Sequence, residues 1–203
     1  MKRNKNLSSI LLSCFYILLS IGLIFTPIRF GFLINPVAYI LYFLGVFLIN
    51  FSMIFLLLFI LNLSKLQSRL STKTLLIIAF FYGLILLFTL LLPGGITLNE
   101  ETQWYPVYSW SFFIIISFVI TGIIICPFLF YSFKTYKLFK EEVLKRKIKL
   151  FFSAVIILFI GWYGAALYNT WDNSVYRSIW SVTGFIIVVI SSVLIYYSMG
   201  RNI

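Results

Sequence analysis

The sequence has no histidine, only two cysteines and only five acidic residues among 203. Histidine is the most frequent general base, the commonest transition-metal ligand and a usual haem ligand, so its absence removes the ordinary centres of these chemistries. Cys14 and Cys126 lie inside separate apolar stretches, where we expect small packing residues rather than a disulfide or a metal pair. We therefore expect no catalytic site, no metal, no cofactor and no enzymatic activity.

Charge of either sign is also scarce. Charged residues make up 10% of the chain and hydrophobic residues 62%, with a mean hydropathy of +1.07. Soluble domains have roughly 25% charged and 45–50% apolar residues, so this composition excludes a soluble globular domain. The net charge of +11 lies in short segments between apolar stretches, which argues against a nucleic-acid partner.

Six apolar stretches are long enough to cross a hydrocarbon core of about 30 Å, which takes about 20 helical residues. They cover residues 7–26, 37–63, 74–92, 109–133, 150–169 and 179–198, and none contains Asp, Glu, Lys, Arg or His. The connecting loops are too short for a separate aqueous domain. We predict an all-α fold, with residues 1–203 forming one integral membrane domain, a polytopic transmembrane bundle of six helices. The first stretch exceeds the apolar length of a signal peptide, so we expect it to be retained.

The orientation follows from the loops, because cytoplasmic loops hold an excess of Lys and Arg. Of the 16 basic residues, only Arg29 and Arg177 fall on one side. The other 14 are Lys2, Arg3, Lys5, Lys65, Arg69, Lys73, Lys134, Lys137, Lys140, Lys145, Arg146, Lys147, Lys149 and Arg201. This asymmetry predicts a multi-pass protein of the cell membrane with both termini in the cytoplasm.

All five tryptophans lie on the predicted outer side, whereas an interfacial aromatic belt is expected at both membrane surfaces. Two interpretations remain open: an outer belt, or a shallow ligand pocket in which Asp172, Glu100 or Glu101 holds a cationic group against the aromatic rings. Asp172 and Arg177 also fit an ordinary ion pair. The residues predicted for the pocket are Trp104, Tyr105, Tyr108, Trp162, Trp171, Asp172, Arg177 and Trp180.

The inner side has one strongly basic segment, residues 134–149, which we expect to continue the fourth helix into the cytoplasm. Tyr136, Phe139, Val143 and Leu150 recur in it at helical spacing. Such a segment either only sets the topology or binds anionic lipid headgroups or an acidic protein partner. The residues predicted to make this contact are Lys140, Lys145, Arg146, Lys147 and Lys149.

These features favour a non-enzymatic sensor or ligand-binding module, with its site at the aromatic outer face and its output at the basic inner segment. In span count and placement alone, the layout resembles the multi-helix sensor regions that head some membrane histidine kinases. A small transporter or channel is the alternative, because Ser9, Ser13, Tyr16 and Ser20 recur at helical spacing. These hydroxyls equally fit helix packing. A scaffold subunit of a membrane complex, with a protein partner or a second copy, is a third possibility.

Overall fold

The computed structural model describes residues 5–34, 36–64 and 71–199, and helices dominate it. The elements are α1 (Lys5–Ile28), η1 (Arg29–Gly31), α2 (Val37–Ser64), α3 (Thr72–Leu90), β1 (Ile96–Thr97), β2 (Val107–Tyr108), α4 (Trp110–Ile120), η2 (Thr121–Ile125), α5 (Cys126–Leu138), α6 (Glu142–Thr170) and α7 (Ser174–Met199). The all-α prediction is confirmed at this level, with one two-residue strand pair added.

Among the described residues, six helical segments are long and apolar enough to cross a membrane, as predicted. They indicate a multi-pass membrane protein. The fourth consists of α4, η2 and α5 in sequence. Its η2 is a π-helical turn that ends just before Cys126-Pro127, where the missing amide proton of proline interrupts the regular α-helical hydrogen bonding. The local distortion at this proline is therefore a π-turn.

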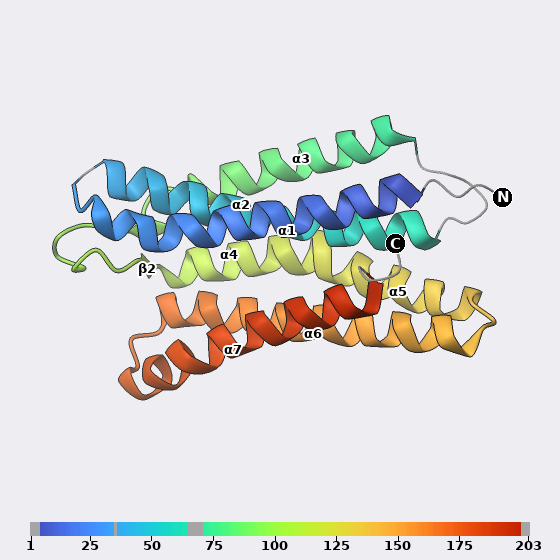
Figure 1. The fold of residues 1–203 in the computed structure, drawn as a ribbon. Coiled ribbons are helices and arrows are strands. Elements are labelled where there is room, and N and C mark those ends of the chain that lie inside the picture. The colour runs from blue at the N-terminus through green and yellow to red at the C-terminus, as the bar shows by residue number, and fades with distance from the viewer. Residues whose placement is uncertain (1–4, 35, 65–70, 200–203) are drawn as a thin grey trace.

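The helices run roughly along one axis, so the bundle has two distinct ends (Figure 1). One end, called the hairpin end, holds η1, the β-hairpin formed by β1 and β2, and the connection 171–173. The termini end holds the start of α1, the end of α7 and the connection 139–141. Lys2, Arg3, Lys65, Arg69 and Arg201, five of the cations assigned to the cytoplasmic side, lie outside the described residues. That the termini end is cytoplasmic stays a prediction.

Two antiparallel helix pairs, α1 with α2 and α6 with α7, share the most extensive contacts. Helix α2 also contacts α3 and α5, and α4 contacts α3 and α6 (Figure 1). The core between them, toward the termini end, is filled by side chains with no exposed surface, among them Ile54, Phe59, Phe128, Phe151 and Ile195. The Tyr16 hydroxyl donates to the Ser192 carbonyl at 2.8 Å, so this member of the hydroxyl series ties α1 to α7.

The expectation that residues 134–149 continue the fourth helix is wrong. Helix α5 ends at Leu138, the backbone is extended at Phe139 and Glu141, and α6 begins at Glu142. The reason is geometric: α6 runs back along the bundle in the direction opposite to α5, so the chain reverses between them, inside the basic segment (Figure 1). Glu142 then lies in the first turn of α6, where a negative charge is favoured by the helix dipole.

Candidate functional site

A short β-hairpin covers one end of the bundle. Gly94, with φ of +68°, has the left-handed conformation that lets the chain leave α3 sharply. Ile96 then pairs with Tyr108 and Thr97 with Val107 in antiparallel register. The Ser109 side chain accepts from the Phe112 amide at 3.3 Å and caps α4 directly after the second strand. The hairpin thus fixes the Tyr108 side chain over the helices.

The hairpin tip is held by its own polar groups. The Thr102 amide donates to the Asn99 side chain at 3.0 Å, and the Trp104 amide donates to the Asn99 carbonyl at 2.9 Å. Gln103 and Trp104 have φ of 51° and 59°, a left-handed conformation that costs energy in residues other than glycine. These contacts set the direction in which the next two residues, Tyr105 and Pro106, enter the bundle end.

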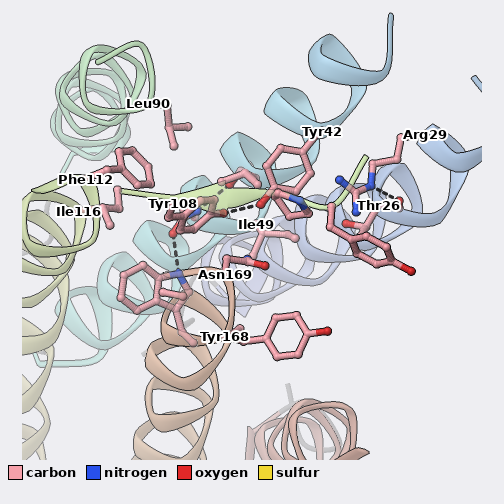
Figure 2. A pocket seen from close by; sticks show the side chains of 17 residues that line it. Thr26, Arg29, Tyr42, Ile49, Leu90, Tyr108, Phe112, Ile116, Tyr168 and Asn169 are labelled. Atoms are coloured by element: carbon pink, nitrogen blue, oxygen red, sulfur yellow. Dashed lines mark hydrogen bonds between the residues drawn. The ribbon is translucent and has the colours of Figure 1, made fainter. Parts of the chain in front are cut away.

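Below this hairpin lies a cavity of about 340 Å³ between the helices (Figure 2). This volume is within the usual range for small-molecule sites. Its lining comes from α1, η1, α2, α3, the hairpin, α4 and α6: Thr26, Arg29, Tyr42, Val46, Ile49, Asn50, Leu90, Tyr105, Pro106, Tyr108, Phe112, Ile116, Trp162, Ala165, Ala166, Tyr168 and Asn169. The lining of α2 runs from Tyr42 to Asn50, roughly 12 Å along the helix axis at 1.5 Å per residue.

The deep end of the cavity is organised by Asn50, near the middle of α2. Its side-chain oxygen accepts from the Trp162 indole nitrogen at 2.7 Å, and its side-chain nitrogen donates to the Val46 carbonyl at 2.7 Å. The Tyr82 hydroxyl donates to the Asn50 backbone carbonyl at 3.1 Å. These bonds link α2, α3 and α6 and satisfy polar groups that lipid cannot solvate.

The opposite end of the cavity contains Arg29, whose residue surface is only 4% exposed. Pro27 lies in the last turn of α1, and the chain tightens into η1 directly after Ile28, which places Arg29 at the cavity (Figure 2). Its Nε donates to the Thr26 carbonyl at 3.2 Å, and its guanidinium carbon lies 4.6 Å from the Phe30 ring centroid and 4.8 Å from that of Tyr42. Its NH1 nitrogen is buried and has no hydrogen-bond partner.

Two buried tyrosines connect the Arg29 end to the hairpin. The Tyr42 and Tyr108 hydroxyls are 2.5 Å apart and share one hydrogen bond. Burial raises the pKa of the Tyr108 hydroxyl, while hydrogen bonds from Tyr42 and Asn169 oppose this shift. The Tyr108 hydroxyl is thus a neutral polar group at physiological pH.

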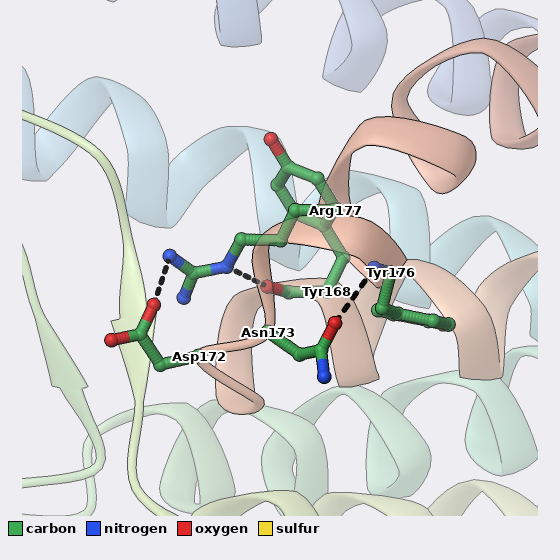
Figure 3. Close-up of polar contacts among 5 residues, drawn as sticks. All are labelled: Tyr168, Asp172, Asn173, Tyr176 and Arg177. Carbon is green, nitrogen blue, oxygen red and sulfur yellow. Dashed lines mark hydrogen bonds and ion pairs between the residues drawn. The ribbon is translucent and has the colours of Figure 1, made fainter.

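A second cavity of about 350 Å³ adjoins the first on the polar side of the hairpin. Both are lined by Tyr105, Pro106, Tyr168 and Asn169, and the second also by Glu101 and Arg177. Arg177 Nε donates to the Tyr168 carbonyl at 3.2 Å, and its NH1 pairs with Asp172 at 2.8 Å (Figure 3). The Tyr105–Pro106 segment therefore forms a partition between a polar outer space and the deeper cavity.

The residues predicted from the sequence are distributed over this region in three ways. Tyr105, Tyr108 and Trp162 line the deep cavity, and Tyr105 and Arg177 line the second. Neither lining includes Trp104, Trp171, Asp172 or Trp180. Trp104 packs against the core, while Trp171 and Trp180 both pack on Tyr176, with ring centroids 5.5 and 5.8 Å apart.

Sequence reasoning did not place three important lining residues: Arg29, Tyr42 and Asn50. In the sequence, Arg29 stands out only as one of two basic residues on the predicted outer side, and nothing there places it in a cavity. Asn50 carried a usable signal, since it is an amide near the middle of an apolar stretch. Tyr42 had none, because only the hairpin brings it to Tyr108.

The Asp172–Arg177 pair is expected to add little stability. The Asp172 side chain is 93% exposed, and exposed ion pairs contribute about 0–1 kcal/mol. Asp172→Asn should therefore change the free energy of unfolding by less than about 1 kcal/mol, as measured by SDS titration in mixed micelles. Glu101→Asn is the matched control. A larger loss for Asp172→Asn alone would show that this pair holds α6 and α7 together.

The predicted basic residues lie at the other end of the bundle, around the connection 139–141. Lys140 is in the connection, and Lys145, Arg146, Lys147 and Lys149 are in the first turns of α6. Lys145 pairs with Glu142 at 3.0 Å. Arg146 and Lys147 line a cavity of about 330 Å³ together with Tyr197 of α7. These cations are one helix length away from the Arg29 cavity.

Comparisons of the chain with protein-family models, with curated proteins and with solved structures find no match. What the deep cavity does must be argued from its own residues.

Proposed function

We propose that the protein is a non-enzymatic ligand-binding module of the membrane, of the sensor type. A small molecule enters the deep cavity from the hairpin end, and its binding alters the basic surface at the termini end. The observation that carries the proposal is the cavity itself: it has an apolar body, a few convergent polar groups and a volume of about 340 Å³.

A sensor is favoured over a transporter because packed side chains lie between the cavity and the termini end. Toward the termini end it is followed by close-packed side chains from α2, η2, α5 and α6 with no exposed surface, including Phe59, Ile124, Phe128 and Phe151. The cavity on the far side of this core, lined by residues such as Ser132 and Phe152, shares no lining residue with the deep cavity. Within the described residues, this packed core therefore separates the two cavities.

Helix α6 supplies a physical route for the output. It runs unbroken from Glu142 to Thr170, roughly 43 Å at 1.5 Å per residue. One end carries the basic residues, and the other contributes Trp162, Ala166 and Asn169 to the cavity. Tyr163 on the same helix is hydrogen-bonded to Thr121 in η2, so the π-turn and α6 are tied at one level. A ligand that displaces α6 therefore displaces the basic surface.

The test uses three phenyl probes whose head groups are anionic, neutral and cationic: benzenesulfonate, benzyl alcohol and benzyltrimethylammonium. We expect at least one to raise the melting temperature of the protein in nanodiscs. Ala165→Trp should abolish this shift, because Ala165 lines the cavity and is exposed, which leaves room for a larger side chain. Ile114→Trp is the matched control, since Ile114 is 63% exposed and is not among the cavity-lining residues. The proposal is contradicted if no probe raises the melting temperature, or if Ala165→Trp leaves every such rise unchanged.

Two measurements on the same protein then distinguish a sensor from a transporter. Spin labels at Val143 and Lys73, both at the termini end, should change their distance distribution when a binding probe is added. Vesicles containing the protein should not accumulate that probe. Accumulation blocked by Ala165→Trp would favour a transporter instead.

A further inference from the structure

The geometry points to an anion as the ligand of the deep cavity: a small amphipathic molecule, or a lipid headgroup, whose oxyanion binds the Arg29 guanidinium. This inference rests on the proposed function and names the chemistry of its site. It starts from the buried Arg29 guanidinium, a positive charge that no carboxylate of the described residues pairs with.

Arg29 has no carboxylate partner within the described part of the chain, which includes all five Asp and Glu residues. The ion pairs found there are Lys145–Glu142 and Arg177–Asp172. A buried cation is costly unless it is paired, and arginine stays charged at any physiological pH. Its remaining contacts are one backbone carbonyl and two aromatic faces, which leave the NH1 nitrogen without an acceptor. The missing partner is therefore a negatively charged acceptor from outside the chain.

The shape of the guanidinium narrows the ligand class further. Its planar set of N–H donors matches two oxygens of a carboxylate, phosphate or sulfonate. The Phe30 and Tyr42 rings lie against the guanidinium, so an acceptor must approach its edge. Beyond Arg29 the lining turns apolar, with Ile49, Phe112 and Ile116. An oxyanion with a compact apolar body fills both halves of the cavity.

The outer cavity does not itself select for charge. It is lined by Glu101 as well as Arg177, and Arg177 is already paired with Asp172. Discrimination between anions and cations must therefore come from Arg29, inside the partition formed by Tyr105 and Pro106. The proposed ligand is therefore negatively charged, whereas the sequence, through Asp172, Glu100 and Glu101, predicts a cationic one.

The decisive variant is Arg29→Met, with Arg29→Lys as the conservative change and Lys73→Gln as the charge-matched control at the termini end. We expect Arg29→Met to weaken benzenesulfonate binding about 10- to 100-fold, the range for losing a hydrogen bond to a charged group. The affinity of Arg29→Met for benzyl alcohol should stay within about twofold of the wild-type value. The affinity of Arg29→Lys for benzenesulfonate should lie between those of the wild type and Arg29→Met. Without a probe, and in detergent from which phospholipid has been removed, Arg29→Met should melt no lower than the wild type, because it removes an unpaired buried charge.

A lipid phosphate and a soluble anion are distinguished by mass spectrometry of the purified protein. Phospholipid retained by the wild type, lost in Arg29→Met and displaced by benzenesulfonate identifies the headgroup as the source, whereas benzenesulfonate binding without retained lipid identifies a soluble anion. The anion proposal is overturned if neither benzenesulfonate binding nor lipid retention depends on Arg29, or if Arg29→Met melts several degrees lower in lipid-free detergent. In that event, benzyl alcohol binding that Ala165→Trp still blocks would leave the proposed function standing.

Discussion

Phe128→Ala is expected to lower the free energy of unfolding by about 3–5 kcal/mol, the range observed when a buried aromatic side chain is truncated and the cavity cannot collapse. Phe128 has no exposed surface, and its ring lies 5.9 Å from both Phe151 and Phe159 and 6.3 Å from Phe152, measured between centroids. All three neighbours are on α6, so the truncation loosens the contact between α5 and α6. SDS titration of the purified protein in mixed micelles measures the effect.

The matched control is Phe130→Ala, two residues along the same helix. Its side chain is 64% exposed on the outer face of the bundle, where lipid is expected to surround it. Removing it takes away contacts with lipid rather than with protein, so the unfolding free energy should change by less than about 1 kcal/mol. Equal losses for the two variants would mean that the core does not lie where the structure places it.

The comparison of Phe128 with Phe130 also explains how far the sequence could predict this protein. Six long apolar runs predict the six long apolar helices, because crossing a membrane requires an unbroken apolar helix, although α6 begins at Glu142, eight residues before the predicted start at 150. The same requirement makes core-facing and lipid-facing side chains equally apolar, so hydropathy does not distinguish the two sides of a helix. Phe128 and Phe130 look alike in the sequence, and only the packing of α5 on α6 separates them.

Prediction failed where the outcome depends on a reversal of direction or on contacts between distant segments. The apolar spacing of Tyr136, Phe139 and Val143 continues across residues 139–141, yet the chain turns there because α6 must recross the bundle. At the site, aromatic residues were found by their clustering on one side of the chain. Arg29 and Tyr42 were not, because their environment is created by α1 ending at Ile28 and by a hairpin more than sixty residues later.

The position of the cavity connects these packing arguments to function. A binding site for an anion must be dry enough to strengthen the pairing and open enough to admit the ligand. The deep end at Asn50 and Trp162 is followed by packed side chains with no exposed surface, which favours the first condition, and the Tyr105–Pro106 partition of the hairpin bears on the second. Helix α6 contributes Trp162 to the deep end and Asn169 to both cavities, so the contacts that fix the position of α6 also set the shape of the site.

Gly164→Leu should be among the most damaging single substitutions, lowering the unfolding free energy by about 3 kcal/mol or more through overpacking. A Cβ at Gly164 would lie 1.9 Å from the nearest atom of the Trp180 ring, far inside van der Waals contact. The ring has little room to retreat, because it stacks on Tyr176 and lies so close to the Gly184 backbone that a Cβ there would be 2.9 Å from its Nε1. Tyr176 in turn donates to the Gly164 carbonyl at 2.9 Å. The added side chain therefore pushes α7 away from α6.

Gly122→Leu supplies the control, since it makes the same chemical change in the fourth span at a glycine with no atom near the added Cβ. It should leave stability within about 1 kcal/mol of the wild type, the scale of the helix propensity difference for glycine. Gly161→Ala tests the gradation: its Cβ would meet one atom under 3.0 Å, the Cγ2 methyl of Ile187 at 2.7 Å, instead of several atoms of a tryptophan ring, so the loss should be smaller than for Gly164→Leu. Because α6 forms one wall of the deep cavity, Gly164→Leu should also weaken probe binding. Retained binding in a destabilised Gly164→Leu protein would mean that the cavity depends on α2 and the hairpin, and that α6 position is not the variable a ligand reads.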